Sequence, residues 1–323
     1  MAIEDSPKNG APVRPVALIA GPTASGKSGV GVALAKRLEE AGRKGVIINA
    51  DSAQVYSDLS VLSARPSEEE MAGIEHRLFG AWDGASACSA ARWAEVAREE
   101  IAKCHEAGDV PILVGGTGMY IKVLLEGIAP IPAIEPEIRE VVRAMPVDIA
   151  YEALMIEDPE RATQLEPGDS QRIARALEVK RSTGVTLGDW QMAKTGGIAE
   201  EIALFPLLLL PPREWLYERC DQRFEVMLDN GAVEEVEALL ARDLDPELPV
   251  MRAIGVPEIA ALLREEATRE ETLEAGAQAT RNYAKRQYTW FRRQTEPDWP
   301  RITSAIESDN IDLSEYFDAL LLD

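Results

Sequence analysis

The sequence lacks long apolar segments and lacks cysteines at metal-binding or disulfide-framework spacings. Its longest apolar run, Leu204–Leu210, is interrupted by Pro206 and is far too short to span a bilayer. Cys88, Cys104 and Cys220 include no CxxC pair, so they indicate neither a disulfide framework nor a zinc site. The chain is therefore expected to be a protein without membrane contact, and the cytoplasm is its default compartment.

The first residues also lack the features of a targeting segment. Residues 1–14 have no apolar stretch of the kind found in signal peptides, and they are predicted to form a flexible leader. The remaining composition, with 46% hydrophobic and 28% charged residues, is typical of a globular protein. The 323 residues suffice for one large domain or two medium ones.

Basic residues are few relative to acidic ones. The chain has 34 Lys and Arg against 56 Asp and Glu, a formal net charge of −22, which argues against a protein that coats nucleic acid non-specifically. Residues 275–295 nevertheless contain no acid, and their cations are Arg281, Lys285, Arg286, Arg292 and Arg293. This segregated block predicts a local basic surface on an acidic body.

Short apolar segments alternate with helical patterns along much of the chain. Strands are predicted at 16–20, 45–49, 110–114 and 203–210, and a helix is predicted at 27–40. This alternation is typical of an α/β fold, a parallel sheet with flanking helices.

One part of the chain departs from this alternation. Residues 131–199 have charged, helix-patterned sequence without a convincing strand, which predicts an all-helical insertion into a core made of 15–130 and 200–323. In the last part of the core, Thr268 and Glu271 form a capping box ahead of a long helix that ends near Arg293.

A phosphate-binding loop follows the first predicted strand. Residues 21–28 read GPTASGKS and match GxxxxGK[ST] between a strand and a helix. Lys27 is expected to reach a terminal phosphate and the Ser28 hydroxyl to bind Mg²⁺. The predicted diphosphate-binding residues are Gly21, Pro22, Thr23, Ala24, Ser25, Gly26, Lys27 and Ser28.

The phosphate loop does not come with the usual magnesium carboxylate of nucleoside triphosphatases. The strand at 110–114 runs into Gly115-Gly116-Thr117, whereas Asp51 follows the strand at 45–49. Carboxyl ends of neighbouring parallel strands share one edge of the sheet, so Asp51, Thr117 and Lys27 should converge.

Several motifs in order resemble those of the tRNA dimethylallyltransferases, also called tRNA isopentenyltransferases. The motifs are GPTASGKS (21–28), NADSAQVY (49–56), GGTGMY (115–120), DSQRIARALE (169–178), RCDQRF (219–224), RAIG (252–255) and AKRQYTWFR (284–292). The resemblance covers almost the whole chain beyond residue 15. Two departures are the segment 62–66, with Arg65 where the family usually has Lys, and 75–78, which retains one histidine, His76.

The resemblance implies a reaction and roles for particular residues. The family transfers a dimethylallyl group from dimethylallyl diphosphate to the exocyclic amine, N6, of adenosine at tRNA position 37, beside the anticodon. Asp51 then corresponds to the general base, and Thr117 and Arg223 to residues that stabilise pyrophosphate. The partner is the anticodon stem-loop, and nothing in the pattern resembles a dimerisation heptad, so a monomer is expected.

Candidate tRNA-binding residues come from the family motifs and from the basic block. Arg139, after the proline-rich start of the insertion, is a further candidate of the same type. The full predicted set is Asp51, Ser52, Ala53, Gln54, Thr117, Arg139, Gln171, Arg172, Ile173, Ala174, Arg175, Arg252, Gly255, Arg281 and Lys285. Alternative functions are a P-loop small-molecule kinase, an adenylate isopentenyltransferase and a non-enzymatic nucleotide-binding module.

Overall fold

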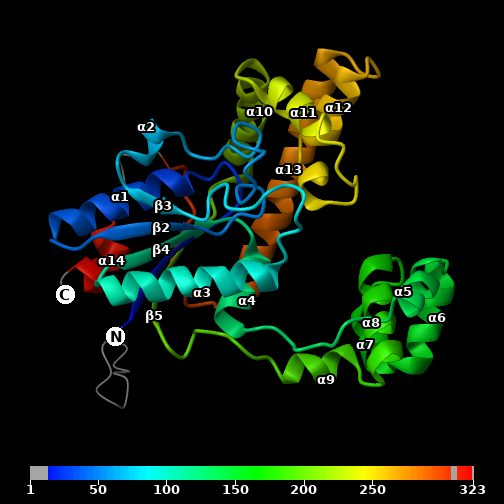
Figure 1. The fold of residues 1–323 in the computed structure, drawn as a ribbon. Coiled ribbons are helices and arrows are strands. Elements are labelled where there is room, and N and C mark those ends of the chain that lie inside the picture. The colour runs from blue at the N-terminus through cyan, green and yellow to red at the C-terminus, as the bar shows by residue number, and fades with distance from the viewer. Residues whose placement is uncertain (1–13, 307–310, 322–323) are drawn as a thin grey trace. The chain divides into compact units, whose positions relative to one another are not determined.

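The computed structural model describes residues 14–306 and 311–321. Within it the chain forms two compact units, one comprising Leu125–Ile198 and the other comprising the chain before and after this insertion (Figure 1). The leader predicted at 1–14 lies outside the described residues except for Arg14. In the described part of the chain, no helix combines the length and apolar character needed to cross a membrane.

The larger unit contains a six-stranded sheet in which all neighbours are parallel, in the order β3-β2-β4-β1-β5-β6. Its strands are β1 (Pro15–Ala20), β2 (Gly45–Asn49), β3 (Glu75–Arg77), β4 (Val110–Gly115), β5 (Ala203–Leu209) and β6 (Arg301–Ile302). The four predicted strands are confirmed and share this sheet. The two edge strands, β3 and β6, were not predicted because they are too short and too polar to leave an apolar pattern.

The central strands are buried on both faces, as their continuous apolar sequences require. On one face, Ile19, Ile47 and Ile112 pack with α1 (Lys27–Glu40) and α14 (Ser314–Leu321). Successive side chains alternate across a strand, so Ile48 and Leu113, both fully buried, face the other way. There α3 (Ala90–Ala107), with Ser89 as its N-cap, packs against β2 and β4.

The remaining helices of this unit are α2 (Glu68–Met71), α4 (Gly118–Glu126), α10 (Arg213–Asp229), α11 (Ala232–Leu240), the 3₁₀ helix η1 (Pro249–Arg252), α12 (Val256–Leu263) and α13 (Arg269–Gln294). Of these, α10 and α13 place side chains against the phosphate loop. The capping box of Thr268 and Glu271 is present at the start of α13, as predicted. α10 and α13 pack against each other so closely that Phe224 fills the space beside Gly276.

The insertion is helical, and its own core holds it together. Its helices are α5 (Pro136–Arg143), α6 (Val147–Glu157), α7 (Pro159–Gln164), α8 (Ser170–Thr183) and α9 (Leu187–Met192). Buried Val142, Leu154 and Ile173 belong to one apolar cluster. The two chain segments that lead into and out of this unit pair through Ile128 and Thr195, so its compact boundary lies at 125–198, against the expected 131–199.

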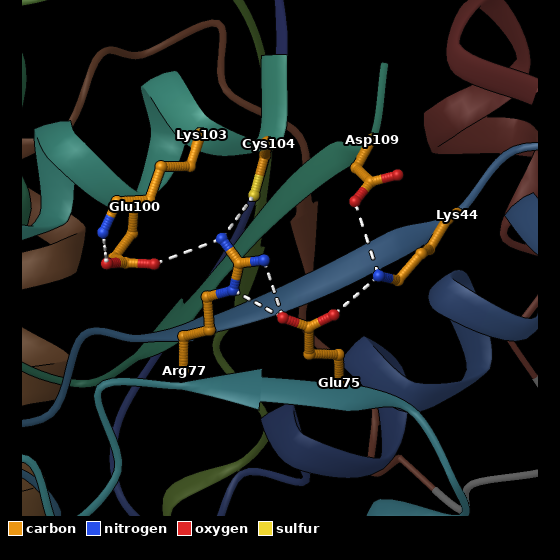
Figure 2. Close-up of polar contacts among 7 residues, drawn as sticks. All are labelled: Lys44, Glu75, Arg77, Glu100, Lys103, Cys104 and Asp109. Carbon is orange, nitrogen blue, oxygen red and sulfur yellow. Dashed lines mark hydrogen bonds and ion pairs between the residues drawn. The ribbon is translucent and has the colours of Figure 1, made fainter. Parts of the chain in front are cut away.

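An ion-pair network fastens the edge strand β3 to its neighbours (Figure 2). Arg77 donates to Glu75 Oε1 at 2.7 Å through Nε and to Glu100 Oε2 at 3.1 Å through Nη1. Glu75 also accepts from Lys44 at 2.6 Å, which ties β3 to the residue before β2. Directly after β3, the Leu78 carbonyl accepts from Asn49 Nδ2 at 3.1 Å. The edge strand therefore supports the end of β2, where Asp51 lies.

Candidate active site

The chain between β1 and α1 forms a tight loop at residues 21–28. Ala24 and Gly26 lie in the left-handed region, with φ of 61° and 91°, and Gly26 caps α1. Such conformations let successive backbone N–H groups surround an anion. At Gly21 only hydrogen fits, because a Cβ would lie 2.4 Å from the Leu209 carbonyl oxygen. The strand, loop and helix predicted around this motif are all present.

Lys27 lies at the start of α1 with its ammonium group turned across the loop. Its Nζ donates to the Pro22 carbonyl oxygen at 2.6 Å. Burial lowers the pKa of Lys27 to about 8, Asp51 opposes this shift, and nearby Arg223 adds to it. A bound anion would favour the charged form of this ammonium group.

Arg223 approaches the same loop from α10. Its Nη1 donates to Thr23 Oγ1 and its Nη2 to the Ala64 carbonyl oxygen, both at 3.4 Å. Burial lowers the pKa of Arg223, and the charge of Asp51 partly offsets this. Two long hydrogen bonds use only part of a guanidinium's donors, so the group can still bind an anion.

The end of β2 carries Asp51 in a fixed turn. The Asp51 backbone N–H donates to Asn49 Oδ1 at 2.9 Å, and Asp51 Oδ1 accepts from the Ala53 N–H at 3.0 Å. Thr117, after β4, accepts the Ser52 N–H at 2.9 Å and donates to Ser52 Oγ at 3.1 Å. The two strand ends meet here, as their place in a parallel sheet predicted.

Tyr283 on α13 joins this group of polar side chains. Burial raises the pKa of Tyr283 to about 12, the charge of Asp51 raises it further, and hydrogen bonds with Thr117 and Ser52 oppose the shift. Tyr283 was not among the predicted site residues, but it lines a cavity.

Gln287 connects the phosphate loop to the end of β4. Its Oε1 accepts from the Thr23 N–H at 2.7 Å, and its Nε2 donates to the Gly116 carbonyl oxygen at 2.8 Å. Gln287 is buried, and a Cβ on Gly116 would lie 2.4 Å from its Nε2. Arg219 likewise supports the loop, donating to the Ala24 carbonyl oxygen at 3.0 Å. Neither residue was predicted to support the site.

Several of these residues line a cavity of about 300 Å³. Its polar lining includes Thr23, Asp51, Ser52, Ser63, Arg223, Arg252, Tyr283 and Arg286. Its apolar lining includes Leu59, Leu62, Phe224, Met227, Pro249 and Ile254. One carboxylate, the half-buried guanidinium of Arg223 and an apolar wall thus share a single cavity, which suits a molecule with an anionic end and a hydrocarbon end.

The loop that carries Leu59 and Leu62 is held by a single carboxylate. Glu235 on α11 accepts backbone N–H groups from Ser60 at 2.5 Å, Val61 at 2.9 Å and Leu62 at 2.8 Å. Three consecutive donors on one side chain fix the loop's backbone, and with it part of the apolar wall.

Comparison with known proteins identifies the family. The family model for IPP transferase matches residues 54–294. The tRNA dimethylallyltransferase of Erythrobacter litoralis is 64% identical over 306 residues, covering 95% of this chain and 95% of that protein. The chain belongs to the tRNA dimethylallyltransferase family. The enzyme of that name from Novosphingobium aromaticivorans is 66% identical over 261 residues, covering 81% and 93% of the two chains.

Solved structures of tRNA dimethylallyltransferases share the fold. The tRNA isopentenylpyrophosphate transferase of Bacillus halodurans aligns with a TM-score of 0.67 and 29% identity, over 96% of this chain and 97% of that chain. A eukaryotic dimethylallyltransferase acting on tRNA aligns with a TM-score of 0.78 and 26% identity, over 96% and 78%.

The predicted tRNA-binding residues of the larger unit lie in different environments. Arg252 is exposed, lines the cavity and pairs with Glu247. Gln54 donates its amide hydrogens to the Ser63 and Ala64 carbonyl oxygens and does not line the cavity. Gly255, with φ of 95°, begins α12 against Leu62, where a Cβ would lie 2.4 Å from Leu62 Cδ1.

On α13, Arg281 pairs with Asp221 and donates to Gln278 Oε1, whereas the side chain of Lys285 is exposed. The insertion carries the other candidates. Gln171 and Arg172 are exposed on α8, and Ile173 is fully buried in the unit's core. Arg139 and Arg175 both approach Glu178. Ala174 is half-buried beside that core.

Of the two departures from the family pattern, the segment 62–66 contributes Leu62 and Ser63 to the cavity lining, whereas Arg65 and the segment 75–78 do not line the cavity. His76 on β3 bonds to the Ile74 carbonyl oxygen through Nδ1 at 2.8 Å, and its ring is 5.4 Å from that of Phe79. These contacts fit a structural role. Arg65 follows the loop held by Glu235, and its guanidinium lies so close to Gly80 that a Cβ there would clash with it.

Proposed function

We propose that this tRNA dimethylallyltransferase family member transfers a dimethylallyl group from dimethylallyl diphosphate to N6 of adenosine 37 in tRNA, releasing diphosphate. The observation that carries this proposal is the cavity in which Asp51, Arg223 and Thr23 share space with an apolar wall. The cations suit the diphosphate, and the wall of Leu59, Leu62 and neighbouring side chains suits the hydrocarbon.

The chemistry needs a stabilised leaving group. As the allylic C–O bond breaks, negative charge develops on the diphosphate, and the backbone N–H groups of residues 21–28, Lys27 and Arg223 are placed to bind it. Both cations are half-buried, and burial lowers the pKa of each, so their attraction for an anion is less screened than at a fully exposed surface.

The chemistry also needs a proton acceptor. As the exocyclic amine attacks the allylic carbon, the new C–N bond forms, the C–O bond to diphosphate breaks, and the amine gives up a proton, which we assign to Asp51. Asp51 Oδ1 accepts from Ala53, and this contact orients the carboxylate. Ser52, held by Thr117, and Tyr283 offer hydrogen-bonding groups to a base that has left its stack.

The oxygen donors present fit Mg²⁺. Ser28 is exposed in the first turn of α1, and Asp51 is the only carboxylate among the cavity-lining residues. Within the described ranges, no three or more His, Cys, Asp or Glu cluster as a metal site. Mg²⁺ often binds through one or two protein oxygens plus substrate phosphates and water, so Ser28 would hold it beside the diphosphate. The ion would neutralise charge on the leaving group.

The site needs one chain and an RNA. We propose that the protein acts as a monomer in the cytoplasm, where its tRNA substrate is found, since nothing in the sequence resembles a dimerisation heptad. Exposed cations near the cavity, Arg252 and Arg286, are suited to the phosphates of the anticodon stem-loop.

One assay separates this function from the alternatives. Radiolabelled dimethylallyl diphosphate is offered with unmodified tRNA, with AMP or without acceptor, and label should enter tRNA alone. Transfer to AMP would instead indicate an adenylate isopentenyltransferase. ATP consumption dependent on Ser28 would favour a kinase, although β4 ends at Gly115 and is followed by Gly116 and Thr117 without a magnesium carboxylate.

A further inference from the structure

A fully buried carboxylate lies in the insertion, outside the cavity already described. Glu178 on α8 has a side chain with 0% exposure. Its Oε1 accepts a hydrogen bond from Arg143 Nε at 2.8 Å, whereas its Oε2 has no hydrogen-bond partner. A buried charge needs compensation from nearby opposite charge, so its neighbours explain why it is tolerated.

Three arginines surround this carboxylate. Arg139 and Arg143 come from α5, one turn apart, and Arg175 comes from α8, one turn before Glu178. Arg139 Nε and Arg175 Nη1 lie 3.9 and 3.8 Å from Glu178 Oε2, beyond hydrogen-bond distance. The three side chains are 49%, 65% and 42% exposed, in chain order. They bury the carboxylate and still present guanidinium groups to solvent.

Another ion pair in the same unit, between one arginine and one glutamate, gives a comparison for the Glu178 cluster. Arg181 forms a fork with Glu157, with three hydrogen bonds of 2.7 to 3.1 Å. One cation meets one anion there, and the pair is complete. Around Glu178 three cations share one anion, so these four groups alone carry an excess of two positive charges, in a chain of net charge −22.

We propose that Arg139, Arg143 and Arg175 form a phosphate-binding face for the tRNA backbone, and that Glu178 is the residue that positions them. This inference rests on the proposed function, in which tRNA is the substrate. Guanidinium groups match phosphate oxygens through paired donors, and groups held in place before binding lose less freedom when they bind. Arg143, which the sequence motifs did not indicate, thereby becomes an RNA contact.

If Glu178 positions the arginines, its replacement should change tRNA affinity in the direction opposite to that expected from net charge alone. Glu178→Gln removes a negative charge and raises the local excess from two to three, so charge alone predicts tighter tRNA binding. Loss of positioning predicts weaker binding, because three flexible side chains must then be ordered by the RNA. With side-chain ordering as the cost, the expected rise in the Kd for tRNA is roughly 3- to 10-fold.

The experiment measures equilibrium binding of unmodified tRNA to the full-length protein at several salt concentrations, together with steady-state kinetics and thermal melting. For Glu178→Gln we expect the weaker binding stated above and a raised KM for tRNA. The KM for dimethylallyl diphosphate and kcat should change less than about twofold, since the face acts only on RNA binding. The matched control is Glu157→Gln, which breaks the complete pair and should leave tRNA binding unchanged.

Arg143→Gln tests the face without relying on Glu178. It should weaken tRNA binding and reduce the slope of log K against log salt by somewhat under one unit, about the effect of one phosphate contact. Unchanged or tighter tRNA binding by a folded Glu178→Gln protein overturns the positioning role. If the salt slope of tRNA binding is unchanged in Arg143→Gln, the arginines do not form a phosphate-binding face. This result decides the question even if Glu178→Gln fails to fold. Absence of prenyl transfer by the unaltered protein overturns the proposed function, whereas tRNA binding tests the face independently.

Discussion

The cations of the cavity and the cations of the insertion are held in contrasting ways. Lys27 and Arg223 are half-buried, and partial removal from water lowers the pKa of each. Arg139, Arg143 and Arg175 remain about half exposed around the buried Glu178. One region partly buries cations beside a small cavity, and the other buries an anion beneath exposed cations.

This difference corresponds to two kinds of anion. A partly buried cation pair attracts a compact diphosphate strongly and is little affected by salt. Exposed guanidinium groups suit a long polyanion, whose binding releases counterions and depends on salt. Substitutions in the cavity should therefore change kcat or diphosphate binding, and substitutions on the insertion should change tRNA affinity and its salt dependence.

The largest effect is expected at Asp51. Asp51→Ala should lower kcat by roughly 10² to 10⁴, because a general base acts in the transition state. Binding of dimethylallyl diphosphate should stay within a few-fold. Single-turnover prenylation and donor binding, measured together, check this. Near-normal turnover would show that Asp51 is not the base.

Lys27→Ala and Arg223→Ala should each weaken inhibition by pyrophosphate as well as catalysis. Both contacts persist with the leaving group, and a lost charged hydrogen bond costs about 1.5 to 3 kcal/mol, or roughly 10- to 150-fold in affinity. The salt dependence of tRNA binding should stay the same in both variants. Unchanged pyrophosphate inhibition constants in both would remove these residues from the phosphate site and end the contrast drawn above.

A pH titration sharpens the same point. The folded pKa of Lys27, about 8, lies below the ordinary 10.5, so the ammonium loses its proton as pH rises through 8. Pyrophosphate favours the charged form, so its affinity should fall above pH 8, by up to about tenfold per pH unit. Binding is measured without added metal. Pyrophosphate itself also titrates in this range, so its affinity for Lys27→Ala is measured over the same pH values as a control. If the two proteins show the same dependence of affinity on pH, Lys27 is not the group that titrates at the phosphate site.

Local sequence signals predicted much of the fold. The helix at 27–40 and the strand at 45–49 have the observed bounds, because apolar runs and a glycine-rich turn define them locally. β3 and β6 escaped prediction because their three and two residues become strands only by pairing with an existing edge. Topology, rather than propensity, creates such strands.

Residues of the candidate site could likewise be predicted where the signal is local in sequence, and could not where it depends on tertiary contacts. The phosphate loop could be predicted because its glycines and Lys27 are contiguous in sequence. Gln287 could not, because its partners Thr23 and Gly116 lie 264 and 171 residues away. The assignment of Glu178 depends on burial and on arginines from two helices, which a single motif does not show.

The smallest effects are expected on α13, where the basic block contains two kinds of cation. Arg281 pairs with Asp221 and bonds to Gln278, whereas Lys285 is exposed. Arg281→Gln should lower the free energy of unfolding by about 0.2 to 1 kcal/mol, the usual size of an exposed ion pair, and should keep the full salt slope of tRNA binding. Lys285→Gln should leave stability unchanged and reduce that slope by somewhat under one unit.

Denaturant unfolding and salt-dependent tRNA binding on both variants decide between these roles. If both variants keep the full slope, α13 contributes no phosphate contact at either position, and its cations serve the fold. Exposed arginines of the insertion and those beside the cavity would then supply the electrostatic part of tRNA binding. If Arg281→Gln also flattens the slope, the pair with Asp221 opens on binding, and pairing in the free protein is a poor guide to which cations contact RNA.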